Sequence, residues 1–373
     1  MNILNNDING KIKSDDQTIP QGKRVFWQQG GGDGERDYID ICIKFEVILN
    51  GPGYAGPLND ETIQILHDDG ISKIAIADRK RFAFIMKSGD IVALKIGLQK
   101  IYAVGIVVGD YQWSDLFGDV DGWSIQHVRR VKWLWVAPKD SEGQYLPKDF
   151  KANVLKQGTT LLLDNPKVLQ WIDSLHLDFT KKYEVKDLPA VDSKKVQIEE
   201  IAEFLYAKGT SSNSIERLVS AIDDLQMIAK WYKSVDYVSE FETESYLIIP
   251  LLRALGWTPQ KMAVEWKNVD IAIFNRLPRE DQNLIAVVEA KRKGKSCLMA
   301  YSQAYNYAKD KENCNRLIVS DGLRYGIFVK HQKKYKLHAY MNITDFRERY
   351  EIYDCAGIKE AIWAMTPDWH YDA

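Results

Sequence analysis

The sequence predicts an α+β multidomain chain with a β-rich N-terminal domain, a helical connector and an α/β C-terminal domain. Its 373 residues are about twice the size of a typical single domain, at roughly 150 residues each. Short β-branched and aromatic runs fill residues 74–136, whereas residues 198–231 carry apolar side chains at helical spacing. From residue 240 onward, helix and strand patterns follow one another in the order α-β-β-α-β.

The composition is that of a folded globular protein. Hydrophobic residues make up 45% and charged residues 27% of the chain, which excludes disordered and collagen-like classes. Fifty Lys and Arg oppose 52 Asp and Glu, for a net charge of −2. No overall basic charge therefore indicates a polyanionic partner, although local basic patches remain possible.

Cysteine usage and the N-terminal segment bear on the compartment. The four cysteines are far apart and form no Cys-x-x-Cys pair, which argues against a disulfide scaffold and a structural zinc site. The first residues lack the apolar core of a signal peptide, and no apolar run of about 18 residues occurs. We therefore expect a cytoplasmic protein without a membrane-spanning segment.

The N-terminal part is divided into an arm and a β domain. Residues 1–24 are polar and aperiodic, and we expect a flexible arm. Residues 25–165 should form the first domain, with a strand at 39–50, a turn-rich stretch at 50–57 and a helix at 60–67. Further strands are expected at 74–77, 82–86, 90–94, 101–108 and 128–136. Their even spacing predicts a small antiparallel barrel.

The remaining chain is divided into a connector and an α/β domain. Residues 166–235 should form a helical connector, with helices near 198–205 and 215–231. Residues 236–373 should form the second domain, which begins with a helix at 240–255 closed by Gly256. Strands at 270–274 and 284–290, a helix at 298–309, and strands at 316–320 and 325–330 complete its predicted order.

Chemistry concentrates at two strands of the second domain. Asp270 opens one strand, and Glu289 and Lys291 end the next on the same face, because side chains alternate along a strand. Carboxylates can hold Mg²⁺ against a phosphate oxygen while a lysine positions water and balances charge. The alternative is a pair of ordinary edge residues, but the preceding run 284–288 is wholly apolar, as in a strand covered on both faces.

These segments resemble a known nuclease superfamily. The stretch 240–257, then 269–274, Val288-Glu-Ala-Lys291 and 303–307 resemble in order the PD-(D/E)XK nucleases. The resemblance is to the nuclease domain of type I restriction motor subunits, and it covers about 110 residues. One departure is that Val269 occupies the position of the proline of the nominal motif, a substitution that this branch tolerates.

The resemblance implies a set of site residues and a cofactor. Asp270 and Glu289 would be metal ligands, completed or supported by Glu240, and Lys291 would be the catalytic lysine. Glu242 and Glu244 compete with Glu240 for its role. On the following helix, Gln303 and Tyr307 match a Gln-xxx-Tyr motif that contacts the substrate backbone or braces the site; by default, helical tyrosines are packing residues. The implied cofactor is Mg²⁺, for which Mn²⁺ can substitute.

A basic run follows the catalytic lysine. Residues 291–295 would be a solvated turn by default, but beside a metal site they can neutralise phosphates. Gly294-Lys295-Ser296 ends like a phosphate-binding loop, yet Glu289 occupies the required first glycine position. We therefore expect no nucleotide triphosphate partner.

The first domain resembles a modified-base reader. The runs 82–94, 103–111 and 127–133 are similar to EVE or PUA-like domains, over roughly residues 25–137. In that family a flipped base enters an aromatic-lined pocket, for which the candidates here are Trp27, Tyr54, Trp113 and Trp123. The basic runs 79–81 and 129–132, with Arg129 and Arg130, would suit phosphate contacts, or else lie on a solvated turn or strand face. The alternative for any tryptophan is burial in the core.

Two glycine-rich segments accompany this domain. Residues 51–56 fit G-x-G-x-x-G with Asp78 downstream, as in dinucleotide folds. Because the later β-rich run does not continue a βαβ alternation, we interpret this segment as the rim of the base pocket. Residues 30–34 are expected near the same pocket.

Together these features predict a stand-alone restriction endonuclease. It would be modification-dependent, hydrolysing DNA phosphodiesters with Mg²⁺ in its second domain while the first recognises a flipped, modified base. One alternative is a conventional defence or repair nuclease that reads unmodified DNA or RNA. Another is a nucleic-acid-binding protein with an inactive nuclease fold. A homodimer is plausible because two cuts on opposite strands need two active sites or two binding events.

Overall fold

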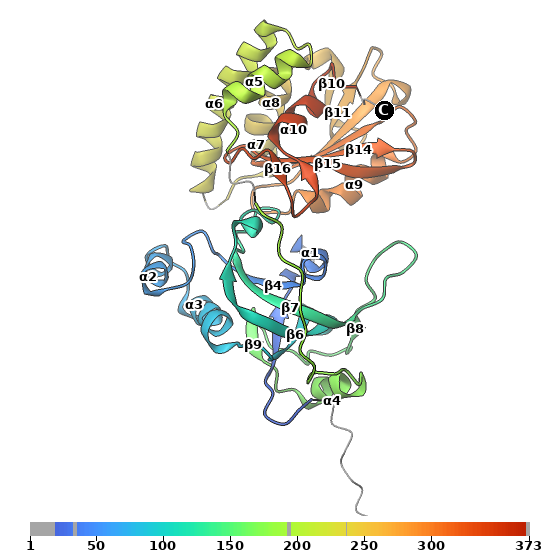
Figure 1. Cartoon of the computed structure of the whole chain (residues 1–373). Coiled ribbons are helices and arrows are strands. Elements are labelled where there is room, and N and C mark those ends of the chain that lie inside the picture. Colours follow the sequence, from blue (N-terminus) through green and yellow to red (C-terminus); the bar gives the residue numbers. More distant parts are fainter. Residues whose placement is uncertain (1–18, 33–35, 192–194, 236, 371–373) are drawn as a thin grey trace, which may run out of the picture. The chain divides into compact units, whose positions relative to one another are not determined.

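The computed structural model describes residues 19–32, 36–191, 195–235 and 237–370 (Figure 1). The chain forms two compact units. The first comprises Met1–Asp33, Asp37–Trp113 and His127–Asp187, and the second comprises Gly34–Arg36, Ser114–Gln126 and Leu188–Ala373. The described part mixes helices and sheets, which confirms the α+β class. Most of the predicted arm, residues 1–18, lies outside the described residues.

The first unit is built on a seven-stranded sheet. Its order is β4-β7-β6-β5-β1-β9, with β8 paired to β6. The strands are β1 (Val25–Gln29), β4 (Val47–Asn50), β5 (Ile91–Ile96), β6 (Lys100–Trp113), β7 (His127–Val136), β8 (Lys148–Asp149) and β9 (Thr160–Leu162). β4 and β9 end the order, so the described strands form an open sheet in place of the predicted closed barrel. The sheet is also mixed, because β1 pairs with β5 in parallel.

Helices occupy two of the strands predicted in this unit and the first part of a third. Residues 39–50 form α1 (Ile39–Lys44), a turn with Glu46 at φ 52°, and only then β4. The runs 74–77 and 82–86 lie in α3 (Lys73–Lys80) and the π-helix η1 (Arg81–Ile85). Buried residues there recur as Ile76, Arg79 and Phe82, a helical period that overrides the β-branched composition. The predicted helix at 60–67 is confirmed as α2 (Asp60–Asp68).

The core of the first unit lies between the sheet and α4 (Pro166–Ser174). Trp27 and Ile91 from neighbouring strands pack with Val168 and Ile172 of α4. The first helix of the expected connector therefore belongs to this core. A short two-stranded sheet, β2 (Gly31–Gly32) and β3 (Arg36–Asp37), precedes α1.

The second unit is built on an eight-stranded sheet. Its order is β10-β11-β12-β13-β14-β15-β17-β16. The strands are β10 (Met262–Trp266), β11 (Val269–Phe274), β12 (Leu284–Ala290), β13 (Arg316–Ser320), β14 (Arg324–His331), β15 (Lys334–Asn342), β16 (Arg349–Tyr350) and β17 (Cys355–Ala356). β12 and β13 run parallel, as does the pair β15 and β17. The four strands predicted here, β11 to β14, are confirmed, whereas β10 and β15 to β17 were not predicted.

Helices cover both faces of this sheet (Figure 1). One face packs, through residues such as Ile271 and Val288, against α5, α6, α8 and α10. The other packs, through Ala272 and Val287, against α9. The helices are α5 (Ile198–Ala207), α6 (Ser212–Lys233), α7 (Glu240–Thr243), η3 (Glu244–Ile248), α8 (Ile249–Ala254), η4 (Pro259–Lys261), η5 (Asp281–Asn283), η6 (Leu298–Ala300), α9 (Tyr301–Ala308) and α10 (Ile358–Met365). The two long helices of the expected connector, α5 and α6, thus form part of the second unit.

The helix predicted at 240–255 is present with an internal change of pitch. α7 continues into the π-helix η3 and then α8, which ends before Gly256 at φ 104°. Pro250 lies in the first turn of α8, where it needs no backbone donor. None of the described helices has the length and apolar character required to cross a membrane.

Candidate metal centre

Two glutamates of the continuous helical stretch α7–η3 lie on one face. Ser239 caps α7 by accepting a hydrogen bond from the Glu242 amide, and the Glu242 carboxylate accepts bonds from the Ser239 amide and hydroxyl in return. Glu242 is therefore occupied as a capping residue. Glu240 and Glu244 are four residues apart. Their side chains are therefore neighbours on the helix surface.

The central strands bring Asp270 and Glu289 together. β11 and β12 are antiparallel, and Ile271 lies opposite Val288. One step further along the same register, Asp270 lies beside Glu289. Asp270 is fixed there because its Oδ2 accepts a hydrogen bond of 2.7 Å from the Ala290 amide.

Three of these acids form a candidate cation site. Glu240, Glu244 and Asp270 each offer a carboxylate oxygen, and the three oxygens lie within 4.8 Å of one another. Glu244 is only 4% exposed, and Glu240 accepts a bond of 3.2 Å from the Arg292 amide. The helix-borne acids Glu240 and Glu244, considered as competitors in the sequence, therefore both lie at the site.

The fourth acid, Glu289, lies beside this triad and is fully buried. Its Oε1 accepts a hydrogen bond of 2.9 Å from Lys291 Nζ. Its Oε2 has no hydrogen-bond partner within the described residues. Lys291 also donates to the Ala290 carbonyl at 2.7 Å, which leaves one of its three ammonium hydrogens for a further acceptor.

The electrostatics of the four acids fit a divalent cation. Burial, reinforced by the charges of Asp270 and other acids nearby, raises the pKa of Glu244 to about 7. Burial also raises the pKa of Glu289 to about 7, against the lowering effect of its bond to Lys291. Hard oxygen donors are the ligands of Mg²⁺. The unpartnered buried oxygen of Glu289 and the three carboxylates beside it are oxygen ligands of the kind that Mg²⁺ binds.

The two residues predicted on the following helix lie on α9, which covers the sheet face opposite α5 and α6. Gln303 is exposed, and Tyr307 packs against the core of that face. Within the described residues, neither side chain has a hydrogen bond to the four acids or to Lys291. Tyr307 thus has the packing contacts that a helical tyrosine has by default.

The four aromatic residues predicted for the base pocket are dispersed. Trp27 is fully buried in the core of the first unit, 5.7 Å from Lys95 Nζ at its ring centroid. Tyr54 is 52% exposed and donates to Asp69 at 2.6 Å. Trp113 donates from Nε1 to the Gly53 carbonyl at 2.8 Å. Trp123 belongs to the second unit, where Arg36 lies over its ring. None of the four lines either of the pockets described below.

The two predicted phosphate-binding arginines bond to the backbone instead. Arg129 is 1% exposed, and donates to the carbonyls of Phe82, Ala83 and Met86 at 2.6 to 3.0 Å. Arg130 is also buried, and donates to the Phe45 and Lys186 carbonyls. These bonds hold the end of η1 and the turn before β4, which accounts for both side chains.

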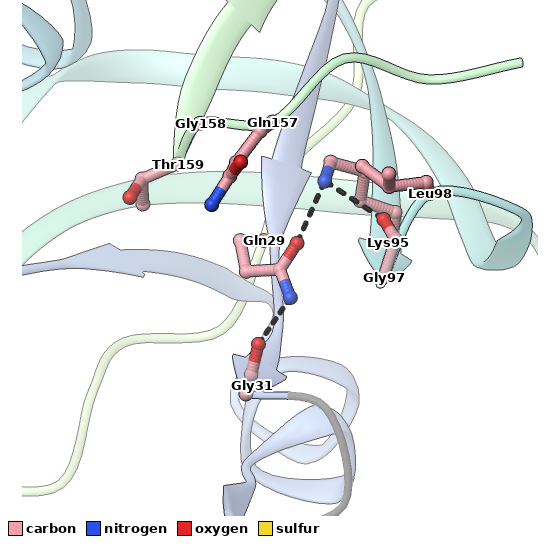
Figure 2. Close-up of a pocket in the computed structure, with 9 residues that line it drawn as sticks. Gln29, Gly31, Lys95, Gly97, Leu98, Gln157, Gly158 and Thr159 are labelled. Atoms are coloured by element: carbon pink, nitrogen blue, oxygen red, sulfur yellow. Dashed lines mark hydrogen bonds between the residues drawn. The ribbon is translucent and has the colours of Figure 1, made fainter. Parts of the chain in front are cut away.

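Two pockets in the first unit share one wall, the segment 157–159. The larger holds about 500 Å³ and is lined by Gln29, Lys95 and glycine backbone (Figure 2). Lys95 Nζ donates to Gln29 Oε1 at 2.7 Å, and Gln29 donates to the Gly31 carbonyl. The smaller pocket holds about 450 Å³, and Asn50, Gly51 and Arg79 line it. Gly31 lines the larger pocket and Gly51 the smaller one, so the two glycine-rich segments, which were expected at the same base pocket, lie at two different pockets.

Comparison with known proteins identifies one region. Residues 30–156 match the model of a domain of unknown function, DUF8426. This match covers about a third of the chain and includes most strands of the first unit. Among curated proteins, no match to the chain is found.

Proposed function

We propose that this protein is a Mg²⁺-dependent nuclease that hydrolyses DNA phosphodiester bonds in its second unit. The observation that carries the proposal is the convergence of Glu240, Glu244 and Asp270 beside the buried Glu289 and its partner Lys291. Four carboxylates in one place repel one another, so they require either protons or a cation. The order of these residues along the chain supports the PD-(D/E)XK resemblance.

Each residue then has a distinct task. Asp270, Glu289 and the two glutamates of α7 and η3 would hold the ion, which supplies Lewis-acid stabilisation of the phosphate when bound. Lys291 donates hydrogen bonds to Glu289 and to the Ala290 carbonyl. These two bonds fix the position of its ammonium group, whose third hydrogen is left to donate to another acceptor. That hydrogen would position the attacking water or neutralise a phosphate oxygen.

The test is cleavage of supercoiled plasmid by the full-length protein with Mg²⁺ or Mn²⁺. Asp270→Asn, Glu289→Gln and Lys291→Ala should each reduce the rate by about 100-fold or more, because removing a group that stabilises the transition state costs several kcal/mol. Chelation should stop cleavage, and added Mg²⁺ should restore it.

Glu242→Gln is the matched control. It removes one carboxylate two residues from Glu240 and Glu244, yet glutamine keeps the capping role. We expect near wild-type cleavage from this variant and a strong loss from Glu244→Gln. Full activity of a folded Lys291→Ala protein would refute the assignment. An absence of cleavage by the wild type on DNA and RNA would favour an inactive nuclease fold that binds nucleic acid.

We further propose that the first unit selects the target, including the recognition of a modified base. Its two adjoining pockets, with polar and backbone linings, support this proposal. The pocket beside Gln29 and Lys95 offers amide and ammonium groups that can read base edges (Figure 2). Since no predicted aromatic residue lines it, recognition there would depend on hydrogen bonds more than on stacking.

Parallel digestion separates this proposal from its alternative. Unmodified, cytosine-modified and adenine-methylated DNA of one sequence should be cut at different rates if a modified base is read. Equal rates would favour a conventional defence or repair nuclease, and an RNA arm tests that substrate. The four free, buried cysteines fit a reducing cytosol, where such an enzyme would act. Analytical ultracentrifugation with and without DNA would test the proposed homodimer.

A further inference from the structure

A buried arginine in the first unit has side-chain donors without a hydrogen-bond partner. Arg79 is 4% exposed, and its Nε and Nη1 have no hydrogen-bond partner within the described residues. Burial lowers the pKa of this guanidinium to about 10. Buried charges are normally paired, since an unpaired one costs several kcal/mol. A ligand is one way to satisfy such a group.

Arg79 lines the smaller pocket together with neighbouring residues of its own helix. Ser72, Ala75 and Arg79 recur at helical spacing, so one face of α3 forms a wall of this pocket. The Ser72 hydroxyl accepts a bond from the Ala75 amide at 3.3 Å, which leaves its own hydrogen to donate. The wall thus offers an arginine fork and a hydroxyl.

The acidic residue of this pocket already has partners of its own. Asp78 also lines the cavity, but its Oδ1 pairs with Arg81 and its Oδ2 accepts a bond of 3.0 Å from the Thr159 amide. Arg81 therefore shares the negative charge of Asp78, which also attracts the Arg79 guanidinium without a hydrogen bond between them. Arg79 thus keeps unbonded donors in the pocket.

Another part of the lining is the segment 157–159, which the two pockets share. Gly158 has φ 137°, and a Cβ there would lie 2.7 Å from the Leu161 side chain, so only glycine fits. Gln157 is exposed, and its amide has no hydrogen bond to another described residue. The lining therefore includes an unbonded amide in addition to the arginine.

We propose that this pocket binds the phosphate group of a nucleotide, with Arg79 as its charged anchor. The guanidinium fork matches phosphate oxygens, and a volume of about 450 Å³ has room for the attached sugar and base. The source of the phosphate is a free nucleotide or a nucleic-acid strand, and the choice of a strand rests on the proposed function. The residues of the basic run 79–81 then have different roles. Arg79 would contact the phosphate, whereas Arg81 pairs with Asp78.

The test is binding by the full-length protein with a chelator present, so that cleavage plays no part. Three probes are titrated: inorganic phosphate, a deoxynucleoside 5′-monophosphate and a short single-stranded oligonucleotide. Arg79→Gln should weaken binding by about ten-fold or more, because the loss of one charge-assisted hydrogen bond lowers affinity by about that factor. Lys80→Gln, which removes the same charge from the exposed side of the same helix, should bind like the wild type.

The three probes identify the source. Measurable affinity for the mononucleotide that matches the oligonucleotide indicates a free nucleotide. Affinity for the oligonucleotide alone indicates a strand. In either case the dependence on Arg79 supports the site, whether or not the protein cleaves DNA. No binding of any probe, or equal losses in Arg79→Gln and Lys80→Gln, would overturn the proposal.

Thermal melting tests whether Arg79→Gln loses binding only because its fold is destabilised. Because Nε and Nη1 of Arg79 have no hydrogen-bond partner among the described residues, Arg79→Gln should melt at the wild-type temperature or above it. A marked decrease in melting temperature with unchanged binding would also overturn the proposal. Should Arg79→Gln fail to fold, Arg79→Lys keeps the charge without the fork, and its binding should be weakened by a smaller factor.

Discussion

At the scale of single residues, the four acids of the second unit are the most costly feature of the fold. Glu244 and Glu289 are almost completely buried, and the pKa of each is raised to about 7. The folded protein therefore holds protons on these groups more tightly than the unfolded chain does. Stability from these two groups is fully present below about pH 4.5 and is lost as the pH rises through about 7.

This linkage predicts how pH and metal act together. In chelator, the free energy of unfolding of the wild type should fall between pH 5 and pH 8 relative to that of Glu244→Gln by on the order of 3 kcal/mol, which lowers its relative melting temperature. The comparison with the variant is needed because His127, with a pKa lowered to about 4, contributes with the opposite sign. Mg²⁺ should stabilise the wild type more at pH 8 than at pH 5.5, since it favours the ionised acids. Differential scanning fluorimetry measures both effects, and parallel pH profiles of the two proteins would contradict this prediction.

Residue identity alone could not separate functional arginines from structural ones. Arg79, Arg129 and Arg130 occur in similar basic runs, yet Arg129 and Arg130 donate to backbone carbonyls while Arg79 lines a pocket. The carbonyls involved belong to η1 and to residues far away in sequence. Such bonds depend on tertiary packing, so only the structure reveals them.

At the scale of elements, the sequence predicted the second unit better than the first. β11 to β14 were predicted because each contains a short apolar run, and in β11 to β13 this run is buried on both faces. In the first unit, α3 and η1 carry β-branched and aromatic residues with helical periodicity, and composition outweighed period in the prediction. The acids of the site were predicted because each one lies at the end of an element whose type was correct.

The loop 114–126 illustrates an element whose role the sequence did not indicate. Asp121 Oδ1 accepts bonds from the Cys297 and Leu298 amides at 3.2 and 3.4 Å, and Oδ2 accepts a bond from Ser296. These groups begin η6, which leads into α9. A residue about 175 positions away in sequence thus performs the capping that a local residue usually provides.

We therefore predict that Asp121→Ala lowers the free energy of unfolding by about 2 to 4 kcal/mol. The change leaves buried donors without an acceptor and places alanine at φ 46°. Asp121→Asn tolerates this backbone and keeps one acceptor, so its loss should be smaller. Denaturant titration measures both, with the exposed Asp110→Ala as control. Equal midpoints for Asp121→Ala and the wild type would show that the cap is dispensable.

At the scale of the whole molecule, neither unit is a single continuous stretch of the chain. The second unit takes the loop 114–126 from the middle of the segment that forms the first. Within it, Asp119 pairs with Arg324 at 2.8 Å and accepts a bond from Asn342 at 2.7 Å. All of these groups are buried or nearly so. A division of the chain by sequence alone, such as a boundary near residue 166 or 236, cannot reproduce this arrangement.

A fragment of residues 188–373 tests this arrangement, because it retains the sheet and the acids but lacks the loop. Arg324 would lose its 2.8 Å partner and keep only Asp321, at 3.4 Å. Breaking a buried pair by removal of one partner costs about 3 to 5 kcal/mol, or about 10 °C in melting temperature for a unit of this size. Hydrogen–deuterium exchange over residues 316–331 should show faster exchange in the fragment than in the full chain. In the full chain, Asp119→Asn should reproduce part of this loss, whereas Asp110→Asn should not. If β13 and β14 are equally protected in the fragment and the full chain, the loop contributes little to the second unit, and residues 188–373 then suffice for its fold.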